Sequence, residues 1–366
     1  MRPEASDQPK RLIIVSDAWH PQVNGVVRTL TKLREQMEAR GFEVTIISPA
    51  DYRSAPCPTY PEIRLALTLP HAVKARIEAL QPAFVHIATE GPLGIMARRA
   101  CLKNNWRFTT SFHTRFPEYM RERLPVPLAW SYAFLRRFHN AAESCLVPTQ
   151  SINDELVDRG FTTLKVWTRG VDRKLFRPQP QVDLELPRPI FLCVGRVAPE
   201  KNLEAFLSLD LPGTKLIVGD GPDLAELKRK YPGAAFAGKK EGEALARCYA
   251  GSDVFVFPSR TDTFGLVLLE AIACGVPVAG YPVPGPKDVI GVSCAGVLSE
   301  DLREAALGAL AMGSVDPDAK LKSFSWEACA DIFESVLTTI VPSREAVAVK
   351  RSRIKRAMSA RQPSDI

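Results

Sequence analysis

The alternation of short apolar stretches with helical segments constrains the fold of this chain more than any other feature. In the first half, stretches such as RLIIVSD (11–17) and FVHIA (84–88) alternate with segments of helical periodicity such as 26–39 and 93–104. Strands that alternate with helices predict a parallel, doubly wound sheet with helices on both faces. The chain is therefore expected to be an α/β protein.

The second half repeats this plan from PIFLCVG (189–195) onward, after FRPQPQVDLELPRP (176–189), which is rich in proline and has little periodicity. Two α/β halves joined by a linker predict a cleft at the carboxyl ends of the strands, where ligands bind. The expected boundaries are 1–172 for the first domain, 173–189 for the linker, 190–324 for the second domain, 325–342 for an amphipathic C-terminal helix and 343–366 for a basic, flexible tail.

Composition excludes several classes of protein. The 366 residues are 46% apolar, yet no stretch approaches the ~18 apolar residues of a membrane-spanning helix. Eight cysteines are scattered without a C-x-x-C pair, which argues against zinc ribbons, redox motifs and a disulfide framework. A cytoplasmic protein is expected, with a place on the inner face of the cytoplasmic membrane as a further expectation.

Charge is unevenly distributed along the chain. Residues 1–172 carry 23 basic and 17 acidic side chains, residues 173–340 carry 18 and 22, and residues 341–366 carry 7 and 2. A basic first half beside an acidic second half favours contact with an anionic surface or ligand. A solvated face with a basic tail is the alternative explanation.

The segment PSRTDTFGLVLLEAIACGVP (258–277) places two carboxylates, Asp262 and Glu270, eight residues apart. The apolar stretch before it predicts a strand, and Gly265 opens a predicted helix that ends near Gly275. A helix N-terminus at the carboxyl end of a strand favours anions. At a rise of ~1.5 Å per helical residue, the two carboxylates could hold opposite ends of an elongated ligand such as a nucleotide sugar.

Two cations, Arg196 and Lys201 in GRVAPEKNL (195–203), follow a predicted strand of the same half. Together they suit a diphosphate and would neutralise the charge of a leaving nucleoside diphosphate. Gly238 ends another predicted strand, so its backbone could reach the edge of a base.

Other motifs carry little weight. VGDGPD (218–223) lacks the third glycine of a dinucleotide-binding loop, which disfavours a nicotinamide cofactor. Asp316 and Asp318 form a D-x-D pair in a loop without a preceding apolar strand, so we expect a turn. No metal and no other cofactor is expected.

In the first half, Asn24 and Gly25 precede a predicted helix, where backbone amides could face a phosphate or an acceptor hydroxyl. A plain helix cap is the alternative. His113 follows a strand and is expected in the same layer as His20 and Glu90. These three residues are the candidates for acceptor binding, and His113 could contact the reacting sugar.

The segment EYMRERLPVPLAWSYAFLRRFHN (118–140) interleaves arginines with aromatic residues. This pattern suits the surface of an anionic membrane. A helix that buries its aromatic residues in the core and leaves its arginines in solvent fits equally well.

From Leu12 to Leu337 the chain resembles the retaining glycosyltransferase family 4, whose GT-B architecture has two Rossmann-like domains facing across a cleft. Its E-x7-E element corresponds to Asp262–Glu270, although the first residue is Asp here. CPTYPEIRLAL (57–67), HIATEGPLG (86–94) and FHTRFPEY (112–119) resemble the branch of bacterial glycolipid synthases and related α-mannosyltransferases. The resemblance implies a C-terminal helix that crosses back to the first domain after Trp326.

The resemblance also implies roles for individual residues. Glu270 would bind the ribose, and Asp262 would bind the sugar. The other implied donor contacts are Asn24, Gly25, Arg196, Lys201, Gly238, Thr263, Phe264, Gly265 and Leu266. The residues expected to take part in catalysis are His113, Arg196, Lys201 and Asp262.

The function implied is a retaining, metal-independent transfer of a hexose or hexuronic acid from a UDP- or GDP-sugar to a membrane lipid such as diacylglycerol. A soluble sugar phosphate or polysaccharide acceptor is the first alternative, and a non-catalytic nucleotide-sugar-binding protein is the second. The expected partners are the nucleotide sugar, the acceptor and an anionic membrane surface. No nucleic-acid partner is expected.

Overall fold

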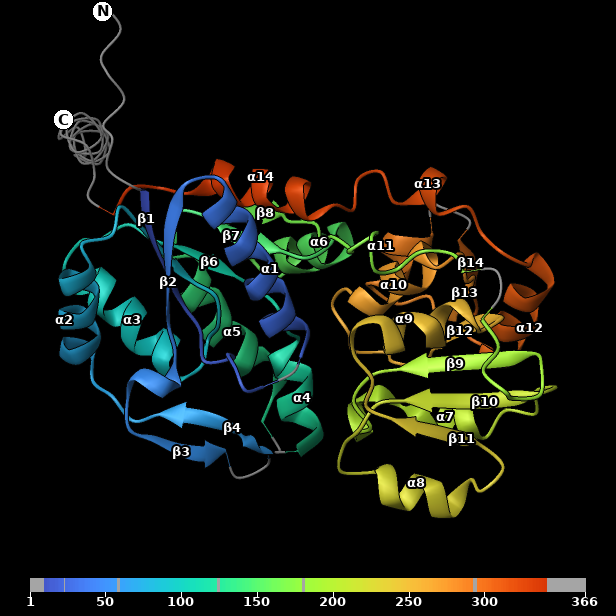
Figure 1. Cartoon of the computed structure of the whole chain (residues 1–366). Coiled ribbons are helices and arrows are strands. Elements are labelled where there is room, and N and C mark those ends of the chain that lie inside the picture. Colours follow the sequence, from blue (N-terminus) through green and yellow to red (C-terminus); the bar gives the residue numbers. More distant parts are fainter. Residues whose placement is uncertain are drawn as a thin grey trace, which may run out of the picture.

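The computed structural model describes residues 10–340 except 23, 58–59, 124–125, 180–181 and 292–294. The chain forms two α/β halves that lie side by side (Figure 1). Each half is a parallel sheet flanked by helices, so the expected doubly wound architecture is confirmed. The tail expected at 343–366 lies outside the described residues, and the exact domain boundaries stay predictions.

The sheet of the first half has six strands within the described residues, and every neighbouring pair is parallel. The order reverses between β1 and β5, which opens a crevice at the carboxyl ends of these strands. In spatial order the strands are β2 (Phe42–Ile47), β1 (Lys10–Val15), β5 (Phe84–Ile87), β6 (Thr109–Ser111), β7 (Cys145–Val147) and β8 (Leu164–Val166).

The described part of the second half has the same plan, with the reversal between β9 and β12. Its strands are, in spatial order, β11 (Ala235–Gly238), β10 (Thr214–Val218), β9 (Ile190–Val194), β12 (Val254–Phe257), β13 (Val278–Gly280) and β14 (Gly296–Leu298). An antiparallel hairpin of β3 (Ser54–Cys57) and β4 (Tyr60–Ala66) extends from the first half. The sequence did not predict this hairpin, because each of its strands contains a proline.

The first half buries both faces of its sheet because side chains alternate along each strand. Leu12 and Ile14 of β1 pack with one cluster, which includes Leu30. Ile13 and Val15 pack with the opposite cluster, which includes Val73. The helices are α1 (Gly25–Ala39), η1 (Pro49–Asp51), α2 (Pro70–Leu80), α3 (Pro92–Lys103), α4 (Phe116–Arg123), α5 (Leu128–His139) and α6 (Gln150–Asp158).

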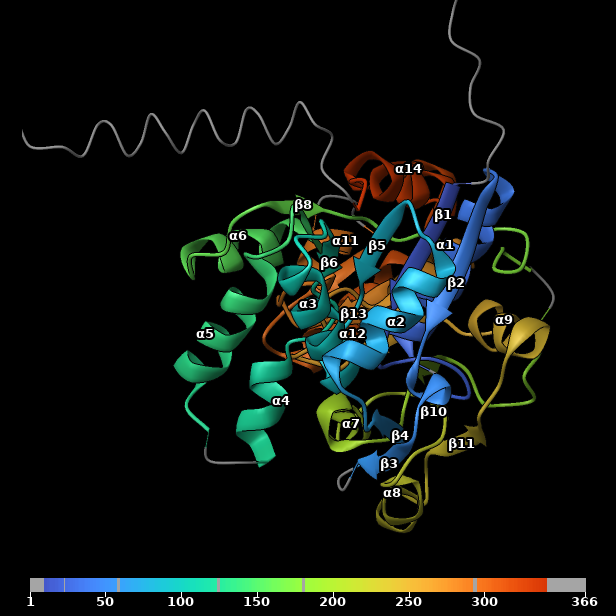
Figure 2. The same ribbon diagram turned by 90° about the vertical axis from the view of Figure 1, so that its left-hand side faces the viewer.

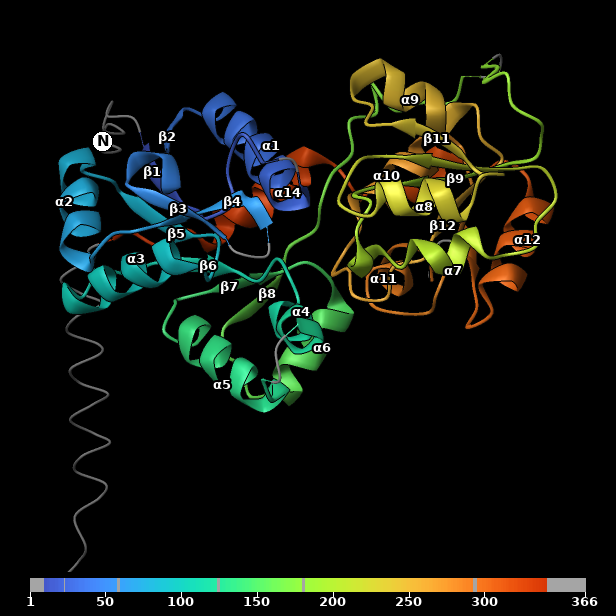
Figure 3. The same cartoon turned by 90° about the horizontal axis from the view of Figure 1, so that it is seen from below.

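The second half is also covered on both faces, as the view from below shows (Figure 3). Its helices are η2 (Pro199–Lys201), α7 (Leu203–Leu207), α8 (Leu224–Lys230), α9 (Gly242–Ala250), α10 (Leu266–Ala273), α11 (Pro286–Ile290), α12 (Leu302–Met312) and α13 (Pro317–Lys320). The sequence did not predict α12. Near α13, Asp316 accepts a hydrogen bond from the backbone of Asp318, so this D-x-D pair forms the expected turn.

The last described helix, α14 (Trp326–Val336), returns to the first half and lies beside α1 (Figure 1). Its Cys329 and Phe333 pack in the same cluster as Leu12 of β1, and Trp167 Nε1 donates a hydrogen bond to the Cys329 carbonyl at 2.9 Å. The expected crossing is therefore confirmed. No helix in the described part of the chain is long and apolar enough to cross a membrane.

The buried side chain of His86 on β5 makes the stability of the folded protein depend on pH. Its two ring nitrogens lie 2.8 Å from Thr109 Oγ1 and from Ser111 Oγ. Burial, followed by the charge of His139, lowers the pKa of His86 to about 3. The unfolded chain takes up this proton near the ordinary pKa of ~6.5, so stability is lost as the pH falls below that value.

We therefore expect His86 to make the free energy of unfolding about 2 kcal/mol smaller at pH 5 than at pH 8. In His86→Gln the side chain is neutral at every pH and can still hydrogen-bond Thr109 or Ser111. The measurement is Tm between pH 8 and pH 5 for both proteins. Equal losses of Tm on acidification would contradict the prediction.

Candidate active site

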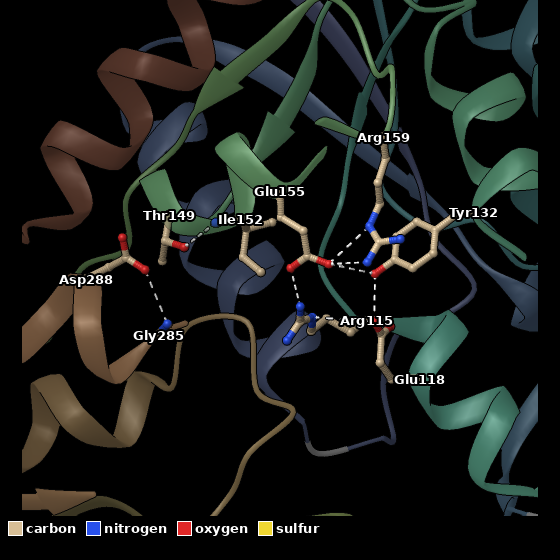
Figure 4. A network of polar contacts seen from close by, with 9 residues as sticks. All are labelled: Arg115, Glu118, Tyr132, Thr149, Ile152, Glu155, Arg159, Gly285 and Asp288. Carbon is tan, nitrogen blue, oxygen red and sulfur yellow. Dashed lines mark hydrogen bonds and ion pairs between the residues drawn. The ribbon is translucent and has the colours of Figure 1, made fainter. Parts of the chain in front are cut away.

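The carboxyl ends of the two sheets meet at the boundary between the halves. Thr263, which follows β12, donates a hydrogen bond from Oγ1 to the backbone oxygen of His113, which follows β6, at 2.6 Å. Nearby, the backbone N–H and the hydroxyl of Ser151 both donate to Asp288 Oδ1 at 3.0 Å. Asp288 Oδ2 also accepts from the backbone N–H of Gly285 (Figure 4). The first of these contacts brings together the candidates Thr263 and His113, which come from different halves.

Glu270, on α10, is a buried carboxylate at this boundary, with its side chain only 5% exposed. Its Oε2 accepts a hydrogen bond from the Tyr249 hydroxyl at 2.8 Å. Its Oε1 lies 2.6 Å from Arg28, which reaches across from α1 of the other half. Burial and the Glu270 carboxylate raise the pKa of Tyr249 well above its ordinary value, so its hydroxyl stays a donor.

Lys201 and Asp262 form a second ion pair. Lys201 lies at the end of η2, and its Nζ is 2.6 Å from Asp262 Oδ1 and 2.8 Å from Oδ2. Both side chains are partly exposed, at 27% and 17%. A charged ligand could therefore reach this pair. The two candidates, 61 residues apart in sequence, are brought together by the fold.

His113 is buried beside an arginine. Arg169 follows β8, stacks over the Trp167 ring and places a guanidinium nitrogen 3.3 Å from His113 Nδ1. Because guanidinium nitrogens only donate hydrogen bonds, Nδ1 accepts, and the proton of the neutral ring is on Nε2. Burial, followed by the charge of Arg169, lowers the pKa of His113 well below its ordinary value.

The Nε2 of His113 is buried and has no hydrogen-bond partner among the described residues. A buried polar atom without a partner is costly unless a ligand or an ordered water satisfies it. Nε2–H is therefore a donor that a substrate atom could use. This is the behaviour expected of a residue that contacts the reacting sugar.

Glycines allow the chain to pack closely at the carboxyl ends of β9 and β10. A Cβ on Gly219 would overlap the backbone oxygen of Gly195, and one on Gly221 would overlap that of Val197. The VGDGPD turn thus packs against the loop that carries Arg196, which is half-buried. Gly238 has a positive φ of 69° and open space where a side chain would lie.

The remaining donor candidates surround the start of α10. Gly265 has φ +86° as the N-cap, which suits glycine, and Leu266 is the first helical residue. The buried Phe264 ring lies 6.1 Å from that of Phe324. Phe264 thus packs beside Arg169. The Arg169 guanidinium lies 6.0 Å from the centroid of the Phe264 ring.

The N-terminus of α1 contains the Asn24–Gly25 pair. Asn24 is the N-cap, and its side chain accepts a hydrogen bond from Val27 N at 3.0 Å. A side chain at Gly25 would meet nothing within 4 Å. The plain cap is therefore present, and the open space beside Gly25 is compatible with a ligand as well.

His20 and Glu90 are not joined to His113. Glu90 Oε1 lies 2.9 Å from His139 Nε2, and His20 lies 3.2 Å from Thr31 Oγ1. Among the described residues, no hydrogen bond or ion pair connects His20, Glu90 and His113. His20 instead lines a small cavity with Trp19 and other residues, namely Pro21, Gln22, Ser48, Pro49, Ala50, Ser54 and Arg64.

Sequence reasoning missed three residues of this site, namely Arg28, Tyr249 and Arg169. Arg28 lies four residues after the cap Asn24, on the same face of α1, and this spacing could have identified it. Arg169 follows a strand and is buried, but the sequence around it has other charged residues, so no pattern singles it out. Within the described residues, no group of three or more His, Cys, Asp or Glu side chains could hold a metal ion.

Comparison with protein families matches both halves of the chain. Residues 23–175 match the model described as Glycosyltransferase Family 4, and residues 188–312 match the one described as Glycosyl transferases group 1.

Three curated relatives span most of the chain. It is 29% identical to the sulfoquinovosyl transferase of Arabidopsis thaliana, over 79% of this chain and 62% of that protein. It is 30% identical to a GDP-mannose-dependent alpha-mannosyltransferase of Mycobacterium tuberculosis, over 76% of this chain and 81% of the relative. It is 25% identical to the alpha-monoglucosyldiacylglycerol synthase of Streptococcus pneumoniae, over 82% of this chain and 78% of that protein.

Solved structures share the fold. A sucrose-phosphate synthase from Thermosynechococcus elongatus superposes with a TM-score of 0.66 at 19% identity, covering 96% of this chain and all of the other. The Anabaena protein HepE in complex with UDP-glucose superposes with a TM-score of 0.62 at 15% identity, covering 89% of this chain and 99% of HepE. The GT-B arrangement of two Rossmann-like halves is thus confirmed for this chain.

The contact between Arg28 and Glu270 generates a prediction about stability. Removing one partner of a fully buried ion pair costs about 3–5 kcal/mol. Because the Arg28 side chain is 42% exposed, we expect Arg28→Ala to cost about 1–2 kcal/mol. The measurement is Tm. Arg34→Ala is the control, since it removes the exposed pair with Glu38 on the same helix.

The effect should depend on the charge of Glu270. Glu270→Gln removes that charge, so adding Arg28→Ala should then lower Tm by less than it does in the unaltered protein. Additive losses of Tm would contradict the assignment of Arg28 as the counter-ion of Glu270.

Proposed function

Because the chain belongs to glycosyltransferase family 4, we propose that it transfers a hexose or hexuronic acid from a UDP- or GDP-sugar to a membrane lipid such as diacylglycerol. The observation that carries the proposal is the buried Glu270 carboxylate at the boundary of two Rossmann-like halves. Such a carboxylate offers strong acceptor oxygens to the hydroxyls of a ribose. It lies within α10, which begins at Leu266, four residues after the candidate sugar contact Asp262.

The donor is proposed to replace protein partners at both ion pairs. Its ribose would take the place of Arg28 on Glu270 Oε1, while Tyr249 keeps Oε2. Its diphosphate would draw Lys201 away from Asp262, with Arg196 as a second cation. Asp262 would then be free to accept hydrogen bonds from sugar hydroxyls. HepE, solved with UDP-glucose, supports a nucleotide sugar as the ligand of this fold.

The proposed chemistry retains the anomeric configuration and uses no metal. The bond between the anomeric carbon and the donor phosphate oxygen breaks, and the acceptor oxygen bonds to the same face of that carbon. The proton of the acceptor hydroxyl passes to the leaving phosphate. Lys201 and Arg196 would stabilise the negative charge that develops on the leaving group, and His113 Nε2–H would orient the sugar.

A lipid acceptor is favoured by one relative whose name states it, the alpha-monoglucosyldiacylglycerol synthase. The acceptor would enter from the first half, where His20 and Trp19 line a cavity. Glu90, which pairs with His139, would contact the acceptor through its second oxygen. The protein would act as a peripheral enzyme at an anionic membrane.

A soluble acceptor is the main alternative, because the relatives also include GDP-mannose-dependent mannosyltransferases. A non-catalytic protein that binds nucleotide sugars is the second. The presence of Arg196, Lys201 and Glu270 in the sequence argues against loss of catalysis.

The proposal is tested by incubating the protein with a panel of UDP- and GDP-sugars and bacterial lipid extract, followed by mass spectrometry of the products. A glycosylated lipid is the expected product. Transfer only to added sugar phosphates or polysaccharides would favour the first alternative, and binding without any transfer would favour the second.

Two substitutions test the donor assignment. Glu270→Ala and Lys201→Ala should each reduce kcat/KM about 100-fold or more, because each removes a charged contact to the donor. Lys230→Ala is the control, since Lys230 forms an exposed pair with Glu204 in the same half. Near-normal turnover of both variants, with the product of the unaltered enzyme, would refute the assignment.

His113 should act without titrating. Since its pKa is held well below the ordinary value, His113→Asn, which keeps an N–H donor, should show the same pH dependence of kcat/KM as the unaltered enzyme between about pH 5.5 and 8. His113→Ala should be the slower of the two variants. A limb of the pH profile that disappears in His113→Asn would contradict a neutral donor role.

A further inference from the structure

The side of the first half that points away from the second half carries a concentration of cations. Figure 2 shows α3 between α2 and α5 on this side. The contacts between these helices agree with this view, because α2 packs on α3 and Arg98 of α3 donates hydrogen bonds to the backbone oxygens of Arg137 and Phe138 on α5. We call this surface the basic face. Its cations are Lys74, Arg98, Arg99, Lys103, Arg136 and Arg137.

Apart from Lys74, these cations form no ion pair with a carboxylate among the described residues. α3 and α5 contain no acidic residue, and the one acidic residue of α2, Glu78, pairs with Lys74 at 3.3 Å. Within the described part of the chain, no ion pair involves Arg98, Arg99, Lys103, Arg136 or Arg137. Burial lowers the pKa of Arg98, and the nearby charges of Arg137 and Arg99 lower it further.

A groove between α2 and α3 opens on the basic face. Lys74, Arg99 and Lys103 line it, and the other lining residues are Pro70, His71, Ala100 and Asn104. No carboxylate lines the groove. A set of donors of this kind suits a phosphate group.

Large apolar side chains are exposed around these cations. Leu67 and Leu69, just before α2, are 65% and 59% exposed, and Leu102 near the end of α3 is 43% exposed. On α5, Trp130 and Phe134 are 73% and 47% exposed and lie one helical turn apart. Exposed apolar side chains among cations mark a surface that meets an amphipathic partner.

The structure thereby divides the aromatic residues of segment 118–140 between core and surface. Tyr132 and Phe138 are buried in the first half, whereas Trp130 and Phe134 are exposed beside Arg137. One face of this helix therefore belongs to the core, as the core interpretation expected, and the other face is exposed, as the membrane interpretation requires.

We propose that the basic face binds the surface of an anionic lipid bilayer. Its cations would contact lipid phosphates, and Trp130, Phe134 and the exposed leucines would enter the interfacial region. A bilayer is favoured over a folded protein partner because it satisfies both components of the face at once, the uncompensated positive charge and the exposed side chains. This inference rests on the proposed function, because an enzyme with a lipid acceptor must reach a bilayer. Vesicle binding is nevertheless measured independently of sugar transfer.

The helix α5, which carries Trp130 and Phe134, takes part in a polar network with the segment that follows His113 (Figure 4). The hydroxyl of Tyr132 on α5 donates to Glu118 Oε1 of α4 at 2.8 Å, and Arg159 stacks over the Tyr132 ring. Arg115, in the loop between His113 and α4, pairs with Glu155 of α6. A bilayer bound at α5 would thus lie against the helices that follow His113.

The test is flotation with phosphatidylglycerol vesicles and with phosphatidylcholine vesicles at low and high salt. The unaltered protein should float with the anionic vesicles at low salt and lose much of this binding at high salt. Because each cation near an anionic surface contributes roughly fivefold, Arg99→Glu with Lys103→Glu should weaken binding about tenfold or more. Trp130→Ser with Phe134→Ser should weaken it at both salt concentrations.

The matched control is Lys228→Glu with Arg229→Glu, which makes the same change of charge on exposed residues of α8 in the other half. The control should float like the unaltered protein, and all variants should keep the Tm and the nucleoside diphosphate affinity of that protein. Equal flotation of the α3 variant and the unaltered protein, equal loss in the control, or no preference for anionic vesicles would overturn the proposal. Binding to vesicles without any sugar transfer would instead contradict only the proposed function.

Discussion

The burial of the Glu270 carboxylate is the constraint on which the candidate site depends. A charge removed from water must be compensated by hydrogen bonds and an opposite charge. Tyr249 supplies the hydrogen bond from within the second half, and Arg28 supplies the charge from the first. The electrostatics of one side chain therefore couple the local site to the contact between the two halves.

The same physical logic explains why the other contacts lie where they do. Parallel sheets place all strand carboxyl ends on one edge, so loops distant in sequence converge there. His113, Arg169, Lys201 and Asp262 all come from such loops or the turns next to them. The ion pair of Lys201 with Asp262 and the buried Nε2–H of His113 are groups that a polar ligand can satisfy.

The fold was largely predictable because the patterns that specify it are local. Alternating apolar stretches and helical periodicity predicted the parallel sheets, and the crossing helix α14 followed from the family resemblance. The hairpin of β3 and β4 was missed because each strand contains a proline, which argues against a strand in a sequence pattern. The contact of Glu90 with His139 was missed as well, since nothing in the sequence shows which polar side chains the core will bring together.

The sequence by itself determined two α/β halves, the two carboxylates that flank the start of α10, and the cations that accompany them, because each lies in a short stretch with its own pattern. The tertiary structure alone decided that Arg28 reaches Glu270, that Arg169 leaves the proton of His113 on Nε2, and which aromatic residues of α5 meet solvent. These outcomes depend on pairs of residues far apart in the chain. Their energies arise only when packing removes water from between them.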